Sequence, residues 1–416
     1  MMSGPCCSCV YSATSSLVRD PVVPVITRPA VHAAAPSRRA PCRRQQAVRC
    51  QAASEGPSIQ RRQLLTAGLV LAGSAGLQQF SQQAQARVVS GEWEQVQLPL
   101  EQGVVLLDIA FTGTDPNHGF LLGSRQTLLE TTDGGRTWSP RSIEAAQDEG
   151  FNYRFQSISF NGDEGWIVGK PAILLKTTDG GKNWERVPLS AKLPGNPILI
   201  VALPGKEGQA EMTTDVGAIY VTNNGAYTWS AAVQETVDAT LNRTVSSGIS
   251  GASYYEGGLS QIARSPAGDY VAVSSRGNFY LTWSPGQTYW QPHNRPTARR
   301  VQNMGWTPEN TLWLSTRGGD VYISSDTGVS ESFDQAKLGS RGFGILDVGF
   351  RNGSMGYACG GSGTLLKTED GGKSWKRDRS TDQVAGNLYA VKFSPKGNGF
   401  ILGNDGILLR YIGQQA

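Results

Sequence analysis

One block of residues recurs three times in this chain, as LLETTDGGRTW (128–138), LLKTTDGGKNW (174–184) and LLKTEDGGKSW (365–375). Its final aromatic residue marks a period of 42 to 61 residues, at Trp93, Trp138, Trp184, Trp229, Trp290, Phe333 and Trp375. Each period holds several short apolar stretches divided by glycine, a pattern typical of a propeller blade with four strands. We therefore expect an all-β fold, a seven-bladed β-propeller.

The second period shows how one blade is expected to be built. Residues 154–160, 165–169, 173–178 and 184–187 form four short segments, separated by turns such as NGDE and DGGKN. We predict that they are strands A, B, C and D of the blade. The Asp-Gly-Gly-Lys turn between C and D supplies residues that accept positive φ in a hairpin.

The last period ends before its blade is complete. It supplies three strands, at residues 387–393, 399–403 and 407–412, and then the chain ends. WEQVQL (93–98) has the pattern of a D strand, but no A, B and C strands precede it. We expect this N-terminal segment to be the missing strand, so that it closes the ring and leaves no open sheet edge.

The T-T-D-G-G-x-x-W block closely resembles the Asp box of propellers that include the sialidases. Its carboxylates, Asp133, Asp179 and Asp370, fall in hairpin turns, where Asp is favoured because it bonds to its own backbone. The block decays to TNNGAYTW, TWSPGQTYW and SSDTGVSESF in blades three, four and five. A shared catalytic role would not tolerate that decay, so we predict a structural role for the box.

The first 86 residues differ in charge from the rest of the chain. They hold nine arginines, no lysine and two acidic residues, a net charge of +7, whereas the remainder has −3. We interpret residues 1–60 as a chloroplast transit peptide, because they are rich in Arg, Ser and Ala and poor in acid. Residues 61–86 combine a twin-Arg pair, a 14-residue apolar run and a small-residue AQA site. They are interpreted as a cleaved thylakoid lumen signal, with a retained signal anchor as the alternative.

The propeller is therefore expected to span residues 87–416, with Arg87 as the mature N-terminus. This part of the chain is poor in the residues that build metal and redox sites. It keeps one of the six cysteines, Cys359, and two histidines, His118 and His293. We expect no internal disulfide, no metal site and no cofactor.

An enzymatic alternative is a sialidase-like glycosidase, since those propellers use a Tyr nucleophile. YYEGG (254–258) places Tyr255 beside Glu256. Neighbouring residues on a strand point to opposite faces, which argues against a joint role for the two side chains. The sequence also has no glycine-rich phosphate loop and no G-x-S-x-G elbow. We expect no catalytic residues.

Arginines are the most informative charges of the propeller. Strands of a blade alternate in direction, so the B-to-C turns and D-to-A connections share one face. We call this the Arg face, and its expected members are Arg125, Arg154, Arg243, Arg276, Arg295, Arg299, Arg300, Arg317 and Arg341. Guanidinium groups bind carboxylates in a bidentate manner, which suits recognition of a protein surface. A solvated rim with internal Arg pairs is the alternative, and nucleic acid fits the acidic propeller poorly. An insertion at 235–258 is expected on the same face.

With these residues in view, the chain resembles the photosystem II stability and assembly factors, called high-chlorophyll-fluorescence factors in chloroplasts. The resemblance covers 87–416 and is carried by GISGASYYEGG (248–258), SSRGNFYLTWSPGQTYWQPHNR (274–295), RRVQNMGW (299–306) and the Asp boxes. It implies a non-enzymatic propeller that aids early assembly and repair by contacting newly made reaction-centre core subunits, and other thylakoid membrane complexes only indirectly.

The resemblance also implies an Arg-rich patch, which we place on Arg243, Arg276, Arg299, Arg300 and Arg317. The other four arginines of the Arg face, Arg125, Arg154, Arg295 and Arg341, are assigned from topology alone. The protein is expected to be a monomer in the thylakoid lumen.

Overall fold

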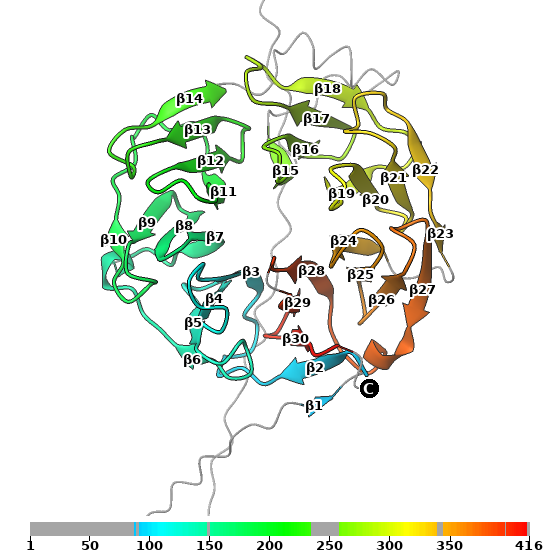
Figure 1. Cartoon of the computed structure of the whole chain (residues 1–416), viewed down its shortest axis with the longest axis horizontal. Coiled ribbons are helices and arrows are strands. Elements are labelled where there is room, and N and C mark those ends of the chain that lie inside the picture. Colours follow the sequence, from blue (N-terminus) through cyan, green and yellow to red (C-terminus); the bar gives the residue numbers. More distant parts are fainter. Residues whose placement is uncertain are drawn as a thin grey trace, which may run out of the picture. The chain divides into compact units, whose positions relative to one another are not determined.

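Seven β-sheets stand around a central axis in this protein, five with four strands and two with five (Figure 1). The computed structural model describes residues 87–88, 91–147, 150–233, 258–338, 344–395 and 397–413. All of them fall in the unit Gln79–Ala416. Within these ranges, no helix is both long enough and apolar enough to cross a membrane.

The blades follow one another along the chain, and in each the strands run in the order A, B, C and D from the inside outward (Figure 1). Blade one contains β3 (Leu106–Phe111), β4 (Gly119–Gly123), β5 (Leu128–Thr131) and β6 (Ser139–Pro140). Blade two contains β7 (Arg154–Asn161), β8 (Glu164–Lys170), β9 (Ile173–Thr177) and β10 (Glu185–Arg186). Blade three contains β11 (Pro197–Ala202), β12 (Ala210–Thr214), β13 (Ile219–Thr222) and β14 (Ser230–Val233). Blade four contains β15 (Leu259–Arg264), β16 (Tyr270–Ser274), β17 (Phe279–Trp283) and β18 (Gln291–Asn294).

The remaining blades repeat this order. Blade five contains β19 (Val301–Trp306), β20 (Leu312–Thr316), β21 (Val321–Ser324) and β22 (Phe333–Gln335). Blade six contains β24 (Ile345–Phe350), β25 (Gly356–Gly360), β26 (Leu365–Thr368) and β27 (Ser374–Asp378). Blade seven contains β28 (Leu388–Phe393), β29 (Gly399–Gly403), β30 (Leu408–Tyr411) and β2 (Trp93–Val96). The predicted seven blades and their register are confirmed, including Phe333 at the start of a D strand.

The two ends of the propeller meet in blade seven. Strand β2 pairs antiparallel with β30, with Trp93 opposite Tyr411 and Val96 opposite Leu408. The expectation that the N-terminal segment closes the ring is therefore confirmed. Just before β2, the Glu92 carboxylate accepts hydrogen bonds from the Tyr357 hydroxyl at 2.7 Å and from Lys367 Nζ at 2.8 Å. These bonds tie the closing segment to blade six as well.

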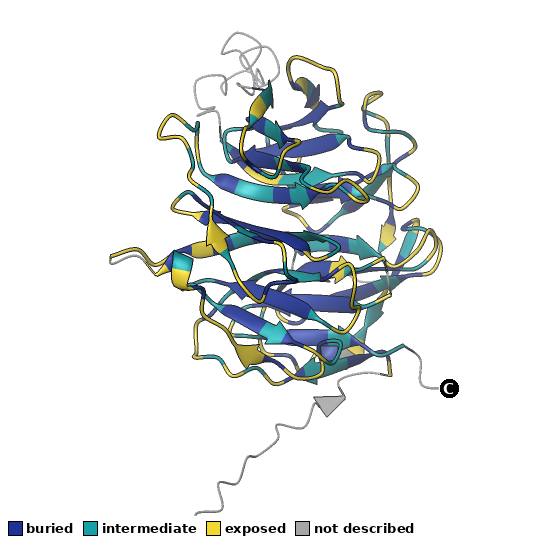
Figure 2. Cartoon of the chain, turned by 60° about the vertical axis from the view of Figure 1, so that its left-hand side comes forward, coloured by how far each residue is buried: buried dark blue, intermediate teal, exposed yellow. Residues whose placement is uncertain are grey.

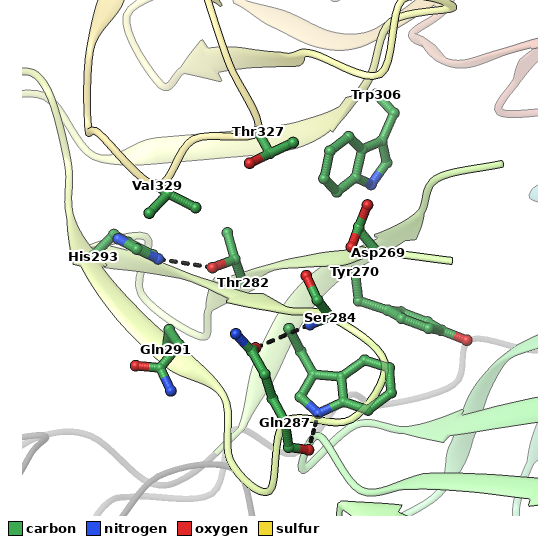
Figure 3. Close-up of a pocket in the computed structure, with 11 residues that line it drawn as sticks. Asp269, Tyr270, Thr282, Ser284, Gln287, Gln291, His293, Trp306, Thr327 and Val329 are labelled. Carbon is green, nitrogen blue, oxygen red and sulfur yellow. Dashed lines mark hydrogen bonds between the residues drawn. The ribbon is translucent and has the colours of Figure 1, made fainter. Parts of the chain in front are cut away.

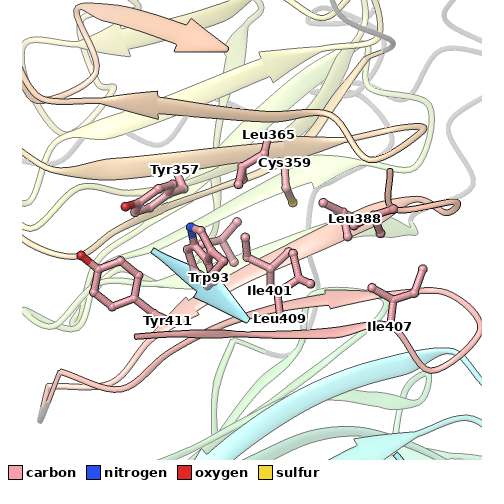
Figure 4. Close-up of a cluster of buried hydrophobic side chains, with 11 residues drawn as sticks. Trp93, Tyr357, Cys359, Leu365, Leu388, Ile401, Ile407, Leu409 and Tyr411 are labelled. Carbon is pink, nitrogen blue, oxygen red and sulfur yellow. The ribbon is translucent and has the colours of Figure 1, made fainter. Parts of the chain in front are cut away.

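Apolar side chains fill the spaces between neighbouring blades. The described residues form seven buried clusters, and Figure 2 shows the buried residues concentrated in the strands, with exposed residues in the turns. The cluster between blades six and seven surrounds Trp93, which is fully buried (Figure 4). Its ring meets Tyr357 and Tyr411 edge-on, with ring centroids 5.0 and 5.2 Å apart. Truncating such a side chain typically costs about 3–5 kcal/mol.

The innermost strands share a register shift near their first residues. In β3 it falls between Leu106 and Asp108, and β7, β11, β15, β19, β24 and β28 have the same feature. In blades one and six, the side chain of the residue just after the shift accepts a hydrogen bond from the backbone of the next blade. Asp108 Oδ2 accepts from the Ile158 N–H at 3.0 Å, and Asp347 Oδ2 accepts from the Val391 N–H at 2.8 Å. These bonds link blades one and two and blades six and seven along the channel wall.

Four short elements lie outside the predicted blade strands. Strand β1 (Arg87–Val88) pairs with the outer side of β2, and β23 (Lys337–Leu338) runs parallel to β27 at the outer edge of blade six. The 3-10 turns η1 (Glu144–Ala146) and η3 (Arg379–Thr381) lie in the connections that follow β6 and β27.

Candidate functional site

The antiparallel pairing within the blades separates the connections into two faces, as expected. The B-to-C turns and D-to-A connections lie on the Arg face. The A-to-B and C-to-D turns lie on the opposite side, which we call the Asp-box face after the turns of Asp133, Asp179 and Asp370.

Three loops of the Arg face meet where blade four adjoins blade five. The Val301 N–H donates to the Gly277 carbonyl at 2.9 Å, and the Arg317 N–H donates to the Arg300 carbonyl at 2.9 Å. Gly277 has a φ of +69°, and a Cβ at this position would lie 2.1 Å from the Val301 oxygen. Only glycine fits such an approach, so the sequence SSRGN holds the loop of Arg276 against the entry to blade five.

Because these loops are in contact, four of the expected arginines lie on neighbouring loops. They are Arg276, Arg299, Arg300 and Arg317. All four side chains are exposed. Arg299 has a defined position within the group, because it pairs with Asp320 at 3.0 Å and donates to the Gly318 carbonyl at 3.3 Å. Arg299 therefore organises the loop after β20. We call these four residues the Arg cluster.

The other expected arginines are placed differently. Arg125 and Arg154 are exposed residues on blades one and two, which are not adjacent to blades four and five in the ring (Figure 1). The Gln126 N–H donates to the Tyr153 carbonyl at 2.7 Å, which joins their two loops. Arg295 directly follows β18, the outermost strand of blade four, and belongs to neither group. The seven expected positions that the structure describes are thus divided among the Arg cluster, the pair Arg125 and Arg154, and Arg295.

Several expected residues lie outside the described ranges. They are Arg243, Arg341, the greater part of the insertion at 235–258, and Tyr255 and Glu256 of the glycosidase alternative.

The Asp-box carboxylates are held by their own turns. Asp179 accepts hydrogen bonds from the Thr177 hydroxyl at 2.7 Å and from the Asn183 N–H and side-chain amide at 2.9 and 2.7 Å. Burial would raise the pKa of Asp179, but these hydrogen bonds outweigh it and lower the pKa to about 2. Asp133 and Asp370 make the corresponding bonds, and their pKa values are lowered for the same reason. The hydrogen bonds of these three carboxylates hold their own turns, in agreement with the predicted structural role.

Two of the decayed boxes keep part of this arrangement. In blade three, Asn224 Oδ1 accepts from the Thr222 hydroxyl at 3.1 Å and from the Thr228 N–H at 3.0 Å. In blade five, Asp326 Oδ1 accepts from the Ser324 hydroxyl at 2.9 Å and from the Gly328 N–H at 2.7 Å. The turn therefore needs an oxygen acceptor at this position more than it needs a charge.

The described residues contain no group of three or more His, Cys, Asp and Glu side chains placed to hold a metal ion. Cys359 is a free, fully buried thiol whose pKa is raised well above its ordinary value by burial, which makes it unreactive.

Comparison with known proteins decides the family. The family model for the photosynthesis system II assembly factor YCF48 matches residues 85–412. This chain belongs to that family. The match covers all seven blades and the closing strand, so the resemblance inferred from the sequence is confirmed.

Individual relatives agree with the assignment. The photosystem II stability/assembly factor HCF136 of Arabidopsis thaliana, described as chloroplastic, is 60% identical over 77% of this chain and 79% of its own length. The solved structure of YCF48 from Cyanidioschyzon merolae is 47% identical, with a TM-score of 0.69, over 77% of this chain and 98% of that one. A solved structure of YCF48 bound to D1 peptide is 43% identical, with a TM-score of 0.66, over 77% and 96% of the two chains.

The family is one of assembly factors and not of enzymes, which confirms the expectation that this protein is non-enzymatic and removes the glycosidase alternative. The chloroplast assignment agrees with the description of the plant relatives.

Proposed function

We propose that this photosystem II assembly and stability factor works in the thylakoid lumen, where it binds newly made reaction-centre subunits through its Arg face. The observation that carries the proposal is the meeting of three loops at the Arg cluster. It presents four guanidinium groups on adjoining loops, in a stretch that has no lysine between residues 207 and 336.

Guanidinium groups suit an acidic segment of a polypeptide. Each can hold a carboxylate through two parallel hydrogen bonds, and the backbone bonds between the loops fix the spacing of the groups. The relative solved with a D1 peptide supports a peptide as the partner, since D1 is a reaction-centre subunit.

Replacing the Arg cluster by alanine tests the proposal. Binding to a D1 peptide should fall at least tenfold in the quadruple variant, and the residual binding should depend less on salt. The fold should survive, because exposed residues usually change stability by less than about 0.5 kcal/mol and an exposed ion pair such as Arg299–Asp320 contributes up to about 1 kcal/mol.

The matched control removes positive charge from the other face. Lys182 and Lys373 lie in Asp-box turns, and their replacement by alanine should leave peptide binding unchanged. Equal loss in both variants would show that net charge alone matters. Unfolding of the quadruple variant, as measured by circular dichroism, would show that the arginines serve the fold.

We also propose that residues 1–60 are the transit peptide and 61–86 the lumen signal, with Arg87 as the mature N-terminus. Mass spectrometry of the protein from isolated thylakoids tests the boundary, and a start beyond Trp93 would contradict it.

Replacing Arg61 and Arg62 by lysine should leave a larger precursor outside the lumen, and normal maturation would rule out the twin-Arg route.

A further inference from the structure

A pocket lies on the Asp-box face between blades four and five, away from the Arg cluster. Its volume is about 140 Å³, a size that takes one ring or one long side chain. Blade four contributes its A-to-B turn, its C-to-D turn and strands β17 and β18, whereas blade five contributes the end of β19 and its Asp-box turn. The pocket is thus built across a blade interface.

The charged group of the pocket is Asp269. Within the described ranges, no hydrogen bond or ion pair engages its carboxylate, although its backbone N–H donates to the Ser265 hydroxyl. Figure 3 shows this carboxylate beside the Trp306 ring, with His293 and Val329 at the other end of the pocket. The Trp306 indole is fixed by a hydrogen bond from its Nε1 to the Ala263 carbonyl at 3.2 Å. A partly exposed ring and a carboxylate without a partner therefore stand side by side.

The surroundings of Asp269 make the pocket favourable for a cation. None of the lining residues in the described part of the chain is Lys or Arg. The nearby Arg264 is already paired with Glu211 at 2.6 Å. Burial lowers the pKa of His293. The carboxylates of Glu331 and Asp326 act in the opposite direction but do not outweigh burial, so the imidazole is neutral at neutral pH.

The C-to-D turns of blades three, four and five differ from the others in the side chains that they expose. In blades one, two and six, the fifth residue after the first Thr of the box is basic, namely Arg136, Lys182 and Lys373. Blades three and five carry Tyr227 and Val329 at this position, and the C-to-D turn of blade four carries Tyr289. These three side chains are 90%, 65% and 60% exposed. The basic residue of the other boxes is thus replaced by an aromatic or apolar residue in blades three and five, the two neighbours of blade four.

We propose that this pocket is a second binding site, which takes a basic side chain, foremost arginine, of a partner polypeptide. The guanidinium would pair with Asp269 and stack on Trp306, and its remaining donors would meet Gln287, Gln291 and Thr327. Tyr227, Tyr289 and Val329 would contact the flanking residues of the same polypeptide. The site does not depend on the Arg face, because it has opposite charge and lies on the opposite side of the propeller.

Titration calorimetry of the full chain tests the site with N-acetyl-arginine amide. One side chain should bind with a Kd of about 1 mM, and the neutral isostere N-acetyl-citrulline amide should bind at least tenfold more weakly. Asp269→Asn should lower the affinity for the arginine derivative at least tenfold. Asp334→Asn is the control, since Asp334 is an exposed acid of blade five that does not line the pocket.

A second pair of variants places the binding in the pocket. Val329→Lys puts a positive charge into the pocket lining and should weaken binding of the arginine derivative at least tenfold by repulsion and by filling the pocket. Tyr227→Lys makes the equivalent change in blade three, outside the pocket, and should bind the arginine derivative normally. Equal affinity for arginine and citrulline derivatives, undiminished binding by Asp269→Asn, or no detectable binding would each overturn the proposal. Tighter binding of methyl glucoside than of the arginine derivative would assign the pocket to a sugar instead.

Discussion

The two rims of this propeller use charged side chains in opposite ways. On the Asp-box face, Asp133, Asp179 and Asp370 accept hydrogen bonds from their own turns, and their pKa values are lowered as a result. On the Arg face, the arginines of the Arg cluster lie on loops that are joined by backbone hydrogen bonds, from Val301 to Gly277 and from Arg317 to Arg300. Residues that repeat from blade to blade serve the fold, whereas the residues that we propose for partner binding are ones that break the repeat.

Both rims depend on a closed ring, so the largest effect is expected from opening it. Deleting residues 91–98 removes Trp93 from the core between blades six and seven, together with Glu92 and its bonds to Tyr357 and Lys367. It also exposes the unpaired edge of β30. We expect a loss of more than about 5 kcal/mol of unfolding free energy, measured by chemical denaturation.

A shorter deletion provides the control for ring closure. Removing Arg87 and Val88 takes away only β1, which pairs with the outer side of β2 and carries no further blade. This change should lower stability by less than about 1 kcal/mol. Comparable losses from the two deletions would mean that β2 is not the element that closes the ring.

The next largest effect concerns the Asp-box turns. Asp179→Ala leaves the Asn183 N–H and the Thr177 hydroxyl without their acceptor and should cost about 1–3 kcal/mol in thermal or chemical unfolding. Asp179→Asn should cost clearly less, because Asn224 serves as the acceptor in blade three. Equal losses in the two variants would show that the charge, and not the acceptor oxygen, holds the turn.

The pH dependence of this turn has a definite sign. The pKa of Asp179 is lowered in the fold to about 2 from an ordinary value of 3.8. Its stabilising contribution is therefore present above pH 3.8 and is lost as the pH falls through about 2. Acid unfolding of the Asp179→Asn variant should lack this component.

The Asp347 carboxylate of β24 belongs neither to an Asp-box turn nor to the Arg cluster, and its pKa is raised rather than lowered. Burial in the channel wall raises the pKa of Asp347 to about 6, although the Val391 N–H and Asn303 Nδ2 donate to it at 2.8 and 3.0 Å. A folded pKa above the unfolded one means that the fold binds more protons, so stability should rise as the pH falls from 7 to 5. We expect about 1 kcal/mol from this group. The measurement is the difference in pH dependence between the parent and Asp347→Asn, and equal slopes would contradict it.

The sequence was sufficient for the blades because their determinants are local. The Asp-box turn, the alternating strands and the incomplete last period lie within one repeat, so Trp93 and Phe333 could be assigned without coordinates. Strands β1 and β23 were not predicted, since two-residue strands at an outer edge have no pattern of their own.

The candidate sites could be predicted only in part. Topology placed the arginines on one face, but their division into the Arg cluster and the pair Arg125 and Arg154 depends on which loops touch. The pocket of Asp269 and Trp306 was missed because its lining comes from two blades and forms only where they pack. One signal was available, namely the apolar residues Tyr227 and Val329 at the turn position where other blades carry Arg or Lys.

The smallest expected changes in stability are those of single substitutions in the Arg cluster. They test most directly whether the two faces use charged side chains in different ways. Arg299 pairs with Asp320 and donates to the Gly318 carbonyl, so Arg299→Ala should lower stability by up to about 1 kcal/mol. Arg300 is exposed and contributes its backbone carbonyl to the contact with Arg317, which alanine preserves, so Arg300→Ala should change stability by less than about 0.5 kcal/mol. If side chains that break the repeat serve a partner, Arg300→Ala should nevertheless weaken binding to a D1 peptide severalfold. Chemical unfolding and peptide titration of the two single variants measure both quantities. An Arg300→Ala variant that loses stability but keeps its affinity would reverse the assignment and make Arg300 a residue of the fold.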